Sequence, residues 1–139
     1  MLKFDLNLAP LFAVAVANFL LSWLWYSPLL FAKPWAKALG LDIEKGMTEE
    51  DKKRMPMLFA SGIFSSFALS FALQVLIYSL GASTLGQGAL IGALAWFGFA
   101  LTGSLGTLWE GRKPTVLLVN NGLFFVSYAV FGGIIAVWH

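Results

Sequence analysis

The side chains in this sequence that are able to do chemistry are mostly uncharged amides and hydroxyls embedded in apolar sequence. Several recur every four residues, a spacing that places them on one face of a helix. The candidates for a polar intramembrane pocket are Asn18, Ser22, Ser66, Ser70, Gln74, Asn120 and Asn121. Amides and hydroxyls accept and donate hydrogen bonds without carrying charge. Two interpretations stay open: these groups line a pocket for a small solute, or they join neighbouring helices by hydrogen bonds.

Ionisable candidates are scarce. Glu110 lies at the end of an apolar stretch, two residues before Arg112. This pair is interpreted either as a salt bridge or as a gate or proton acceptor at the inner mouth of a pathway. The chain has no Cys, and its one His is the last residue, so no metal cluster or nucleophile triad can be assembled. We therefore expect no enzyme, no metal site and no cofactor.

The elements that position these side chains are set by where charge is absent. No Asp, Glu, Lys, Arg or His occurs in the stretches Leu6–Ala32, Met55–Trp109 and Pro114–Trp138. Only 12% of the 139 residues are charged and the mean hydropathy is +0.80, whereas a soluble domain carries roughly 25% charged residues. The pattern indicates an integral membrane protein, because a charge in hydrocarbon costs several kcal/mol. The lipid bilayer is thus the expected partner, and nucleic acid is not.

The apolar stretches predict an all-α membrane protein, a bundle of four transmembrane helices forming one domain over residues 1–139. A span needs about 20 apolar residues, and the Gly-rich break at Gly81–Gly88 divides the second stretch in two. The four helices are expected at about residues 8–26, 57–80, 88–108 and 115–138. We read the first as an uncleaved span, because its apolar run is too long for a signal peptide.

The orientation is predicted from the basic residues. Eight of the nine Lys and Arg lie in the inner loop 33–54 and the turn 112–113, and only Lys3 lies on the other side. Both connections are therefore expected in the cytoplasm and both termini outside. Phe31–Leu39 is expected to lie on the membrane surface as an amphipathic segment, with Thr48 capping the next helix. The basic loop is also a candidate site for anionic lipid.

Small residues thin the third predicted helix. They are Gly88, Gly92, Gly103 and Gly106. Glycines at such spacing let two helix backbones approach closely, so these residues are candidates for helix packing within the bundle or for an oligomer contact. We therefore expect a homo-oligomer of closed symmetry with this helix at or beside the contact.

A cluster of aromatic residues and prolines follows the first helix, in the sequence WYSPLLFAKPW from Trp25 to Trp35. Pro28 is expected to end the helix, because the residue before a proline avoids the α conformation. Trp25 and Tyr26 are expected at the depth of the lipid headgroups, with Trp35 anchoring the returning chain. These residues predict a structural elbow at the interface.

This stretch resembles the signature of a bacterial membrane family filed as domain of unknown function 1761. The segments Leu108–Pro114 and Val119–Gly122 fit the same family. The resemblance covers nearly the whole chain and implies a small four-helix protein of the bacterial inner membrane, without an established activity. It also implies a His on the fourth helix where this chain has Phe124, so a proton or metal role built on that His does not carry over to this chain.

Two functional hypotheses from different classes remain open. The first is an oligomeric membrane protein with a polar intramembrane pocket, used for the transport of a small solute or ion. The alternative is a non-transporting membrane assembly or lipid-binding scaffold, in which the same polar residues only hold helices together.

Overall fold

The computed structural model describes residues 1–138, and these fold into helices joined by short connections. Four helices are long and apolar enough to cross a membrane, which confirms the expected all-α, four-span class. They are α1 (Leu8–Trp25), α3 (Glu49–Ser79), the continuous helix Leu85–Trp109, and α6 (Pro114–Val137). The third span consists of α4 (Leu85–Ala95), a π-helical segment η2 (Trp96–Leu101) and α5 (Thr102–Trp109).

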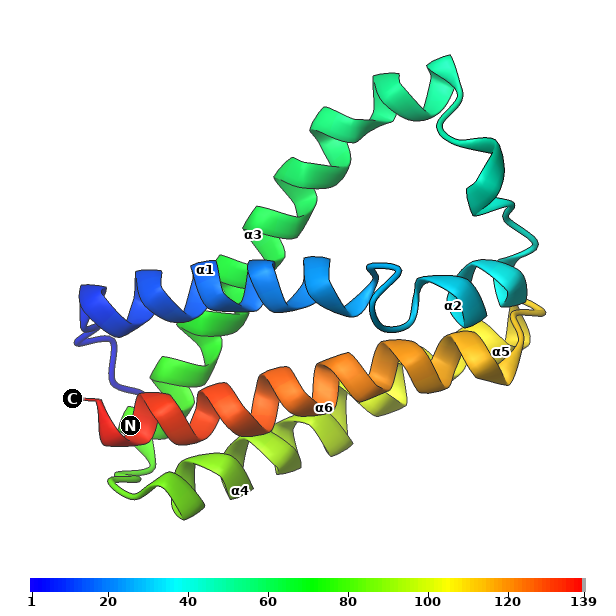
Figure 1. Ribbon diagram of the computed structural model, residues 1–139. Coiled ribbons are helices and arrows are strands. Elements are labelled where there is room, and N and C mark those ends of the chain that lie inside the picture. The colour runs from blue at the N-terminus through cyan, green and yellow to red at the C-terminus, as the bar shows by residue number, and fades with distance from the viewer. Residues whose placement is uncertain (139) are drawn as a thin grey trace.

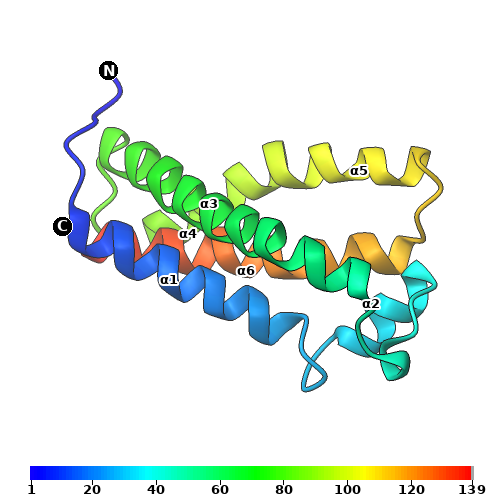
Figure 2. The same ribbon diagram turned by 90° about the horizontal axis from the view of Figure 1, so that it is seen from above.

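The spans are arranged around α6. Figure 1 shows α1 and α4 running alongside α6 on different sides, and α4 makes its most extensive contact with α6. The long helix α3 crosses α1 obliquely, and its first half diverges from the other helices (Figures 1 and 2). The buried apolar core lies where the second half of α3 meets α1 and α6, and includes Val14, Leu73, Ile77, Phe131 and Ile135.

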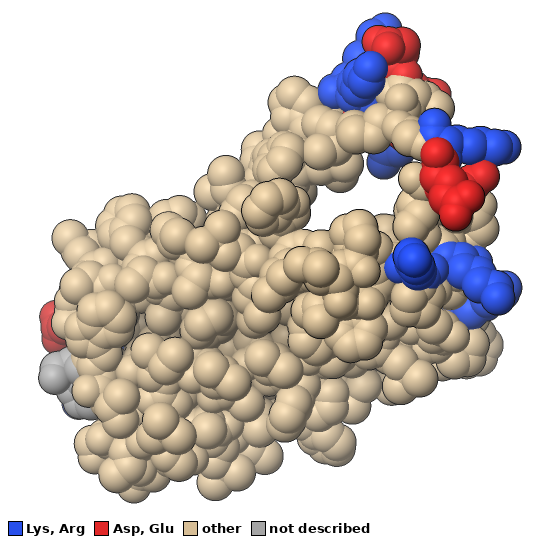
Figure 3. Space-filling model, in the orientation of Figure 1, with Lys and Arg blue, Asp and Glu red and all other residues tan. Residues whose placement is uncertain are grey.

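The charged residues collect at one end of the molecule. Figure 3 shows Lys, Arg, Asp and Glu over the connection between α1 and α3 and at the start of α3, while the length of the helices on this face is uncharged. That connection contains α2 (Ala32–Leu39) and the 3-10 turn η1 (Ile43–Lys45). The two basic connections therefore share one end, opposite the chain termini. This is the arrangement that the predicted orientation requires.

Helix ends follow local sequence signals. Gly40 ends α2 in the left-handed conformation, with φ of 73°, which glycine adopts without steric penalty. Thr48 caps α3 through a reciprocal pair of hydrogen bonds with Asp51, as the sequence predicts. The helix therefore begins in the charged segment and continues, past Pro56, into the apolar stretch. Thr84 and Gln87 form the same kind of box, so α4 begins three residues earlier than expected.

The glycines of the third span divide into two groups. Gly88 and Gly92 pack against α6 of the same chain, where a Cβ on either would overlap the backbone carbonyl of Gly132 or Tyr128. Of the two roles expected for these glycines, helix packing or an oligomer contact, Gly88 and Gly92 serve packing within the chain, because Gly132 offers the complementary surface. Gly103 and Gly106 face open space. Homo-oligomer formation through that second pair stays a prediction.

Candidate functional site

The polar stripe of α3 joins that helix to α1. The Gln74 side chain accepts a hydrogen bond from the Asn7 N–H (2.9 Å) and donates one to the Asn7 carbonyl (3.1 Å). One turn away, the Ser70 hydroxyl donates to the Leu11 carbonyl at 2.8 Å. Both Ser70 and Gln74 are fully buried. They hold the start of α1 against α3 and do not line the cavity described below, so their predicted place in a pocket is corrected.

Asn18 and Ser66 continue this line of contacts toward the charged end. The Asn18 Nδ2 group donates to the Ser66 hydroxyl at 2.9 Å, and both side chains are buried. The Asn18 Oδ1 atom is also buried but has no hydrogen-bond partner in the described chain. Ser66 is able to satisfy only one end of the amide, whichever way the amide is turned. Most buried polar atoms do find a partner, so the free end of Asn18 marks a candidate binding site.

A cavity of about 340 Å³ lies beside Asn18, between α1, α3, η2 and α6. Its lining residues are Asn18, Ser22, Ser65, Leu69, Ala100, Leu123, Phe124, Ser127 and Tyr128. Asn18 and Ser22 are thus the two predicted pocket residues that the structure brings to the cavity. Ser22 lines it while donating a hydrogen bond to the Asn18 carbonyl. Phe124 stands where the family resemblance places a His, so this position faces the cavity.

The sequence prediction did not include Ser127 and Tyr128, although both carry polar groups at the cavity. The sequence does show Ser127 as a polar residue six positions after Asn121 in the same uncharged helix, which is the kind of residue that was considered for the pocket. Within residues 1–138 the Tyr128 hydroxyl makes no hydrogen bond. The π-helical segment supplies another wall through Ala100. Such widened turns are frequent at functional sites.

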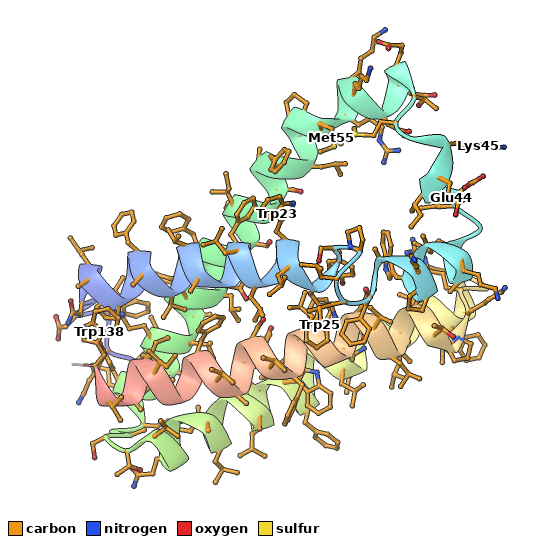
Figure 4. All side chains as sticks on the ribbon, in the orientation of Figure 1. Trp23, Trp25, Glu44, Lys45, Met55 and Trp138 are labelled. Carbon is orange, nitrogen blue, oxygen red and sulfur yellow. The ribbon has the colours of Figure 1, made fainter. Side chains whose placement is uncertain are left out.

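Asn120 belongs to the elbow, not to the cavity. The Tyr26 hydroxyl donates a hydrogen bond to Asn120 Oδ1 at 2.6 Å. The Trp25 indole N–H donates to the Val119 carbonyl at 2.9 Å, and Figure 4 shows Trp25 pointing from α1 toward α6. A Cβ on Gly122 would lie 2.9 Å from the Trp25 ring, so glycine leaves the room that the indole occupies. The predicted elbow therefore docks on the first half of α6.

Trp35 completes the elbow on the α2 side. Its ring lies 5.2 Å from the Tyr26 ring, and the Phe31 ring lies 4.7 Å from that of Trp25. Pro28 follows the helix end in the turn between α1 and α2. These contacts fix the angle at which the chain leaves α1 and comes back along α2.

Two further predicted site residues lie elsewhere. The Asn121 amide donates to the Ser104 hydroxyl of α5 at 2.8 Å, so it joins α6 to α5 instead of lining the cavity. Glu110 and Arg112 form a salt bridge of 3.4 Å in which both side chains are largely exposed. Exposed pairs of this kind contribute little. Within residues 1–138 there is no group of three or more His, Cys, Asp or Glu residues able to hold a metal ion.

A larger hollow of about 900 Å³ opens at the opposite end, between the N-terminal segment and the end of α3. Lys3, Asp5, Asn7 and Tyr78 are among its lining residues. It shares no lining residue with the cavity at Asn18. The two hollows are therefore separate.

Four apolar helices, with charge confined to one end and to the N-terminal segment, define a multi-pass integral membrane protein, in which the residues that line the cavity at Asn18 are all uncharged. The family model described as "Protein of unknown function (DUF1761)" matches residues 9–136. The chain belongs to this family, as its sequence motifs indicate. No curated protein and no solved structure matches the chain.

Proposed function

We propose that this protein is a membrane-embedded binding protein for an uncharged ligand, which it holds in the cavity beside Asn18. The single observation that supports the proposal most is that Asn18, whose buried Oδ1 atom has no hydrogen-bond partner in the described chain, is one of the residues that line the cavity. A buried polar atom without a partner costs about 1–3 kcal/mol. A ligand that donates a hydrogen bond to this atom recovers that free energy, which gives the cavity a reason to prefer such a ligand over a lipid chain.

The lining favours an uncharged ligand over an ion. None of the described residues that line the cavity is Asp, Glu, Lys or Arg. An ion moved into this cavity would lose its hydration without gaining a charged partner, which is strongly unfavourable. The transport of a small uncharged solute therefore stays a prediction, whereas the lining gives no support for ion transport. Glycerol flux into proteoliposomes measures the transport step separately from binding.

Fluorine NMR at one cavity residue tests the binding step. A fluorinated phenylalanine at position 124 reports on the cavity, and the same label at Phe97 reports on an exposed site of the third span. We expect titration with 1-octanol in nanodiscs to shift the Phe124 signal saturably and to leave Phe97 with at most a small, linear change. Equal responses at the two positions would overturn the proposal, because they indicate partition of the alcohol into lipid alone.

Two substitutions make this test specific. Asn18→Leu removes the amide with the unpaired Oδ1 atom and is expected to abolish the saturable shift. Because Asn18 also bonds Ser66, Tyr128→Phe serves as the gentler variant. It removes a cavity hydroxyl that has no hydrogen bond within residues 1–138, so it is expected to weaken octanol binding without unfolding the protein.

A lipid-binding scaffold is the second candidate, favoured by the charged end of the molecule. Lys33 and Lys37 are exposed on α2, one helical turn apart. Basic residues at a membrane surface attract anionic lipid, at about 1 kcal/mol each. Replacing both by Gln is expected to reduce enrichment of phosphatidylglycerol around the reconstituted protein. An unchanged lipid shell would argue against this candidate.

A further inference from the structure

A second hollow adjoins the cavity beside Asn18. It has a volume of about 370 Å³ and lies between α3 and the third span. The two hollows share Ser65, Leu69 and Tyr128, so they form one groove with Tyr128 at the junction. Each volume alone reaches the range of known ligand sites, about 300–1,000 Å³.

The two ends of this groove differ in chemistry. Beyond Ser65 and Tyr128, the second hollow is lined by carbon side chains alone, from α3, α4 and η2. They include Phe64, Ala68, Ala72, Leu73, Leu76 and Phe99. The first hollow adds the Asn18 amide, whose Oδ1 atom has no partner in the described chain, and the hydroxyls of Ser22 and Ser127. The groove therefore has a polar end in the interior of the protein and a long apolar end along α3.

We infer that the ligand is an uncharged amphiphile with one long apolar chain, such as a long-chain alcohol, and this inference rests on the binding function proposed above. Its head donates a hydrogen bond to Asn18 Oδ1 and accepts one from the Tyr128 hydroxyl. Its chain lies along α3 between Phe64 and Phe99. A small, wholly polar solute would make no use of the apolar hollow, which the largely exposed rings of Phe64 and Phe99 help to line.

A site of this kind in a bilayer must select its ligand from among the surrounding lipid chains. Lipid tails are as apolar as the groove, so hydrophobicity gives no advantage over the surrounding membrane. The preference for one chain must come from close packing in the groove and from the hydrogen bonds of the head. Ala68 and Ala72 leave the space that the chain occupies. Filling that space is expected to remove the preference for a long chain and to leave the head contacts intact.

The experiment compares 1-hexadecanol with 1-octanol in nanodiscs, using the fluorine label at position 124 and expressing each alcohol as a mole fraction of lipid. We expect 1-hexadecanol to reach half-saturation at a mole fraction at least tenfold lower than 1-octanol. Hexadecane has no head, and hexadecyl sulfate carries a charge, so neither is expected to give a saturable shift.

Three variants locate the head and the chain. Ala68→Leu is expected to raise the half-saturating fraction of 1-hexadecanol to that of 1-octanol, with octanol binding unchanged. Ala60→Leu is the matched control, because Ala60 is exposed on α3 and lines neither hollow. It is expected to behave like the unmodified protein. Tyr128→Phe is expected to weaken both alcohols by a similar factor.

The outcomes separate this inference from the function on which it rests. If both alcohols bind saturably with equal affinity and Ala68→Leu changes neither, the long-chain inference is overturned and the binding function stands. If hexadecane binds as well as 1-hexadecanol, the hydroxyl head contributes nothing to binding, and the proposed contacts of the head are overturned. If no alcohol gives a saturable shift at position 124, both proposals fail.

Discussion

The Tyr26 hydroxyl and the Asn120 amide are joined by a hydrogen bond of 2.6 Å, although 94 residues separate them in the chain. Tyr26 lies in the first stretch that resembles the family, and Asn120 lies in the last. The neighbouring Trp25 indole bonds the Val119 carbonyl beside it. The two stretches therefore form one structural unit, in which the end of α1 docks on α6. Their residue types follow from this docking without reference to a ligand.

Removal of this hydrogen bond should destabilise the protein. Tyr26→Phe leaves the Asn120 oxygen without a partner, and we expect a loss of about 1 kcal/mol in the free energy of unfolding. Unfolding by SDS in mixed micelles measures it. Because Asn120→Ala removes the other half of the same bond, the double variant should lose less than the sum of the two single losses. Strictly additive losses would show that the two side chains do not interact.

Gln74→Leu tests the contact between α1 and α3. The substitution leaves the N–H and carbonyl groups of Asn7 without their partners, and we expect a loss of about 1–2 kcal/mol in the free energy of unfolding. Ser61→Ala is the control, because Ser61 is exposed on the same helix and its hydroxyl donates only to the Leu58 carbonyl of that helix. A Gln74 variant as stable as the control would contradict the assignment.

The two glycine groups predict different outcomes for the same kind of change. Gly92→Leu places a side chain into the α6 backbone of the same chain, so it is expected to prevent correct packing, as overfilled cores do. Gly103→Leu meets open space and is expected to fold normally. If the protein forms a homo-oligomer through the exposed part of the third span, Gly103→Leu lowers its mass in mild detergent to that of the monomer. A monomer from the unmodified chain in several detergents would contradict the oligomer prediction.

The orientation across the membrane is open to cysteine labelling, since the chain has no Cys. Lys45→Cys lies at the charged end and Ser83→Cys lies in the turn between α3 and α4. The positive-inside rule predicts that an impermeant thiol reagent added outside labels only position 83. Labelling of position 45 from outside would show that the protein has the opposite orientation.

The sequence predicted the helices well because each span is set by a one-dimensional quantity, the length of an uncharged apolar run. The same holds for Thr48, whose capping role depends only on neighbouring residues. The π-helical segment at Trp96–Leu101 was not predicted, since its sequence differs in no local signal from an ordinary apolar helix.

The cavity was predicted only in part, because polar residues at equal depth can have different partners. Asn18 and Asn120 were both expected to line it, yet Asn120 is taken by the Tyr26 hydroxyl. Similarly, the sequence left open whether Gly92 packs against a helix of the same chain or of another subunit, and its partner lies on α6 of the same chain. Rotation of each helix about its own axis decides such pairings, and that rotation depends on the whole bundle.

Photocrosslinking from position 124 tests the proposed binding function most directly, because it requires no knowledge of the ligand. Benzoylphenylalanine replaces Phe124 at the cavity in one variant and the exposed Phe97 in another. Both proteins are irradiated in native membranes, purified and weighed by mass spectrometry. We expect one discrete added mass of an uncharged amphiphile at position 124 and none at position 97. The same heterogeneous mixture of bulk lipid adducts at both positions would contradict it.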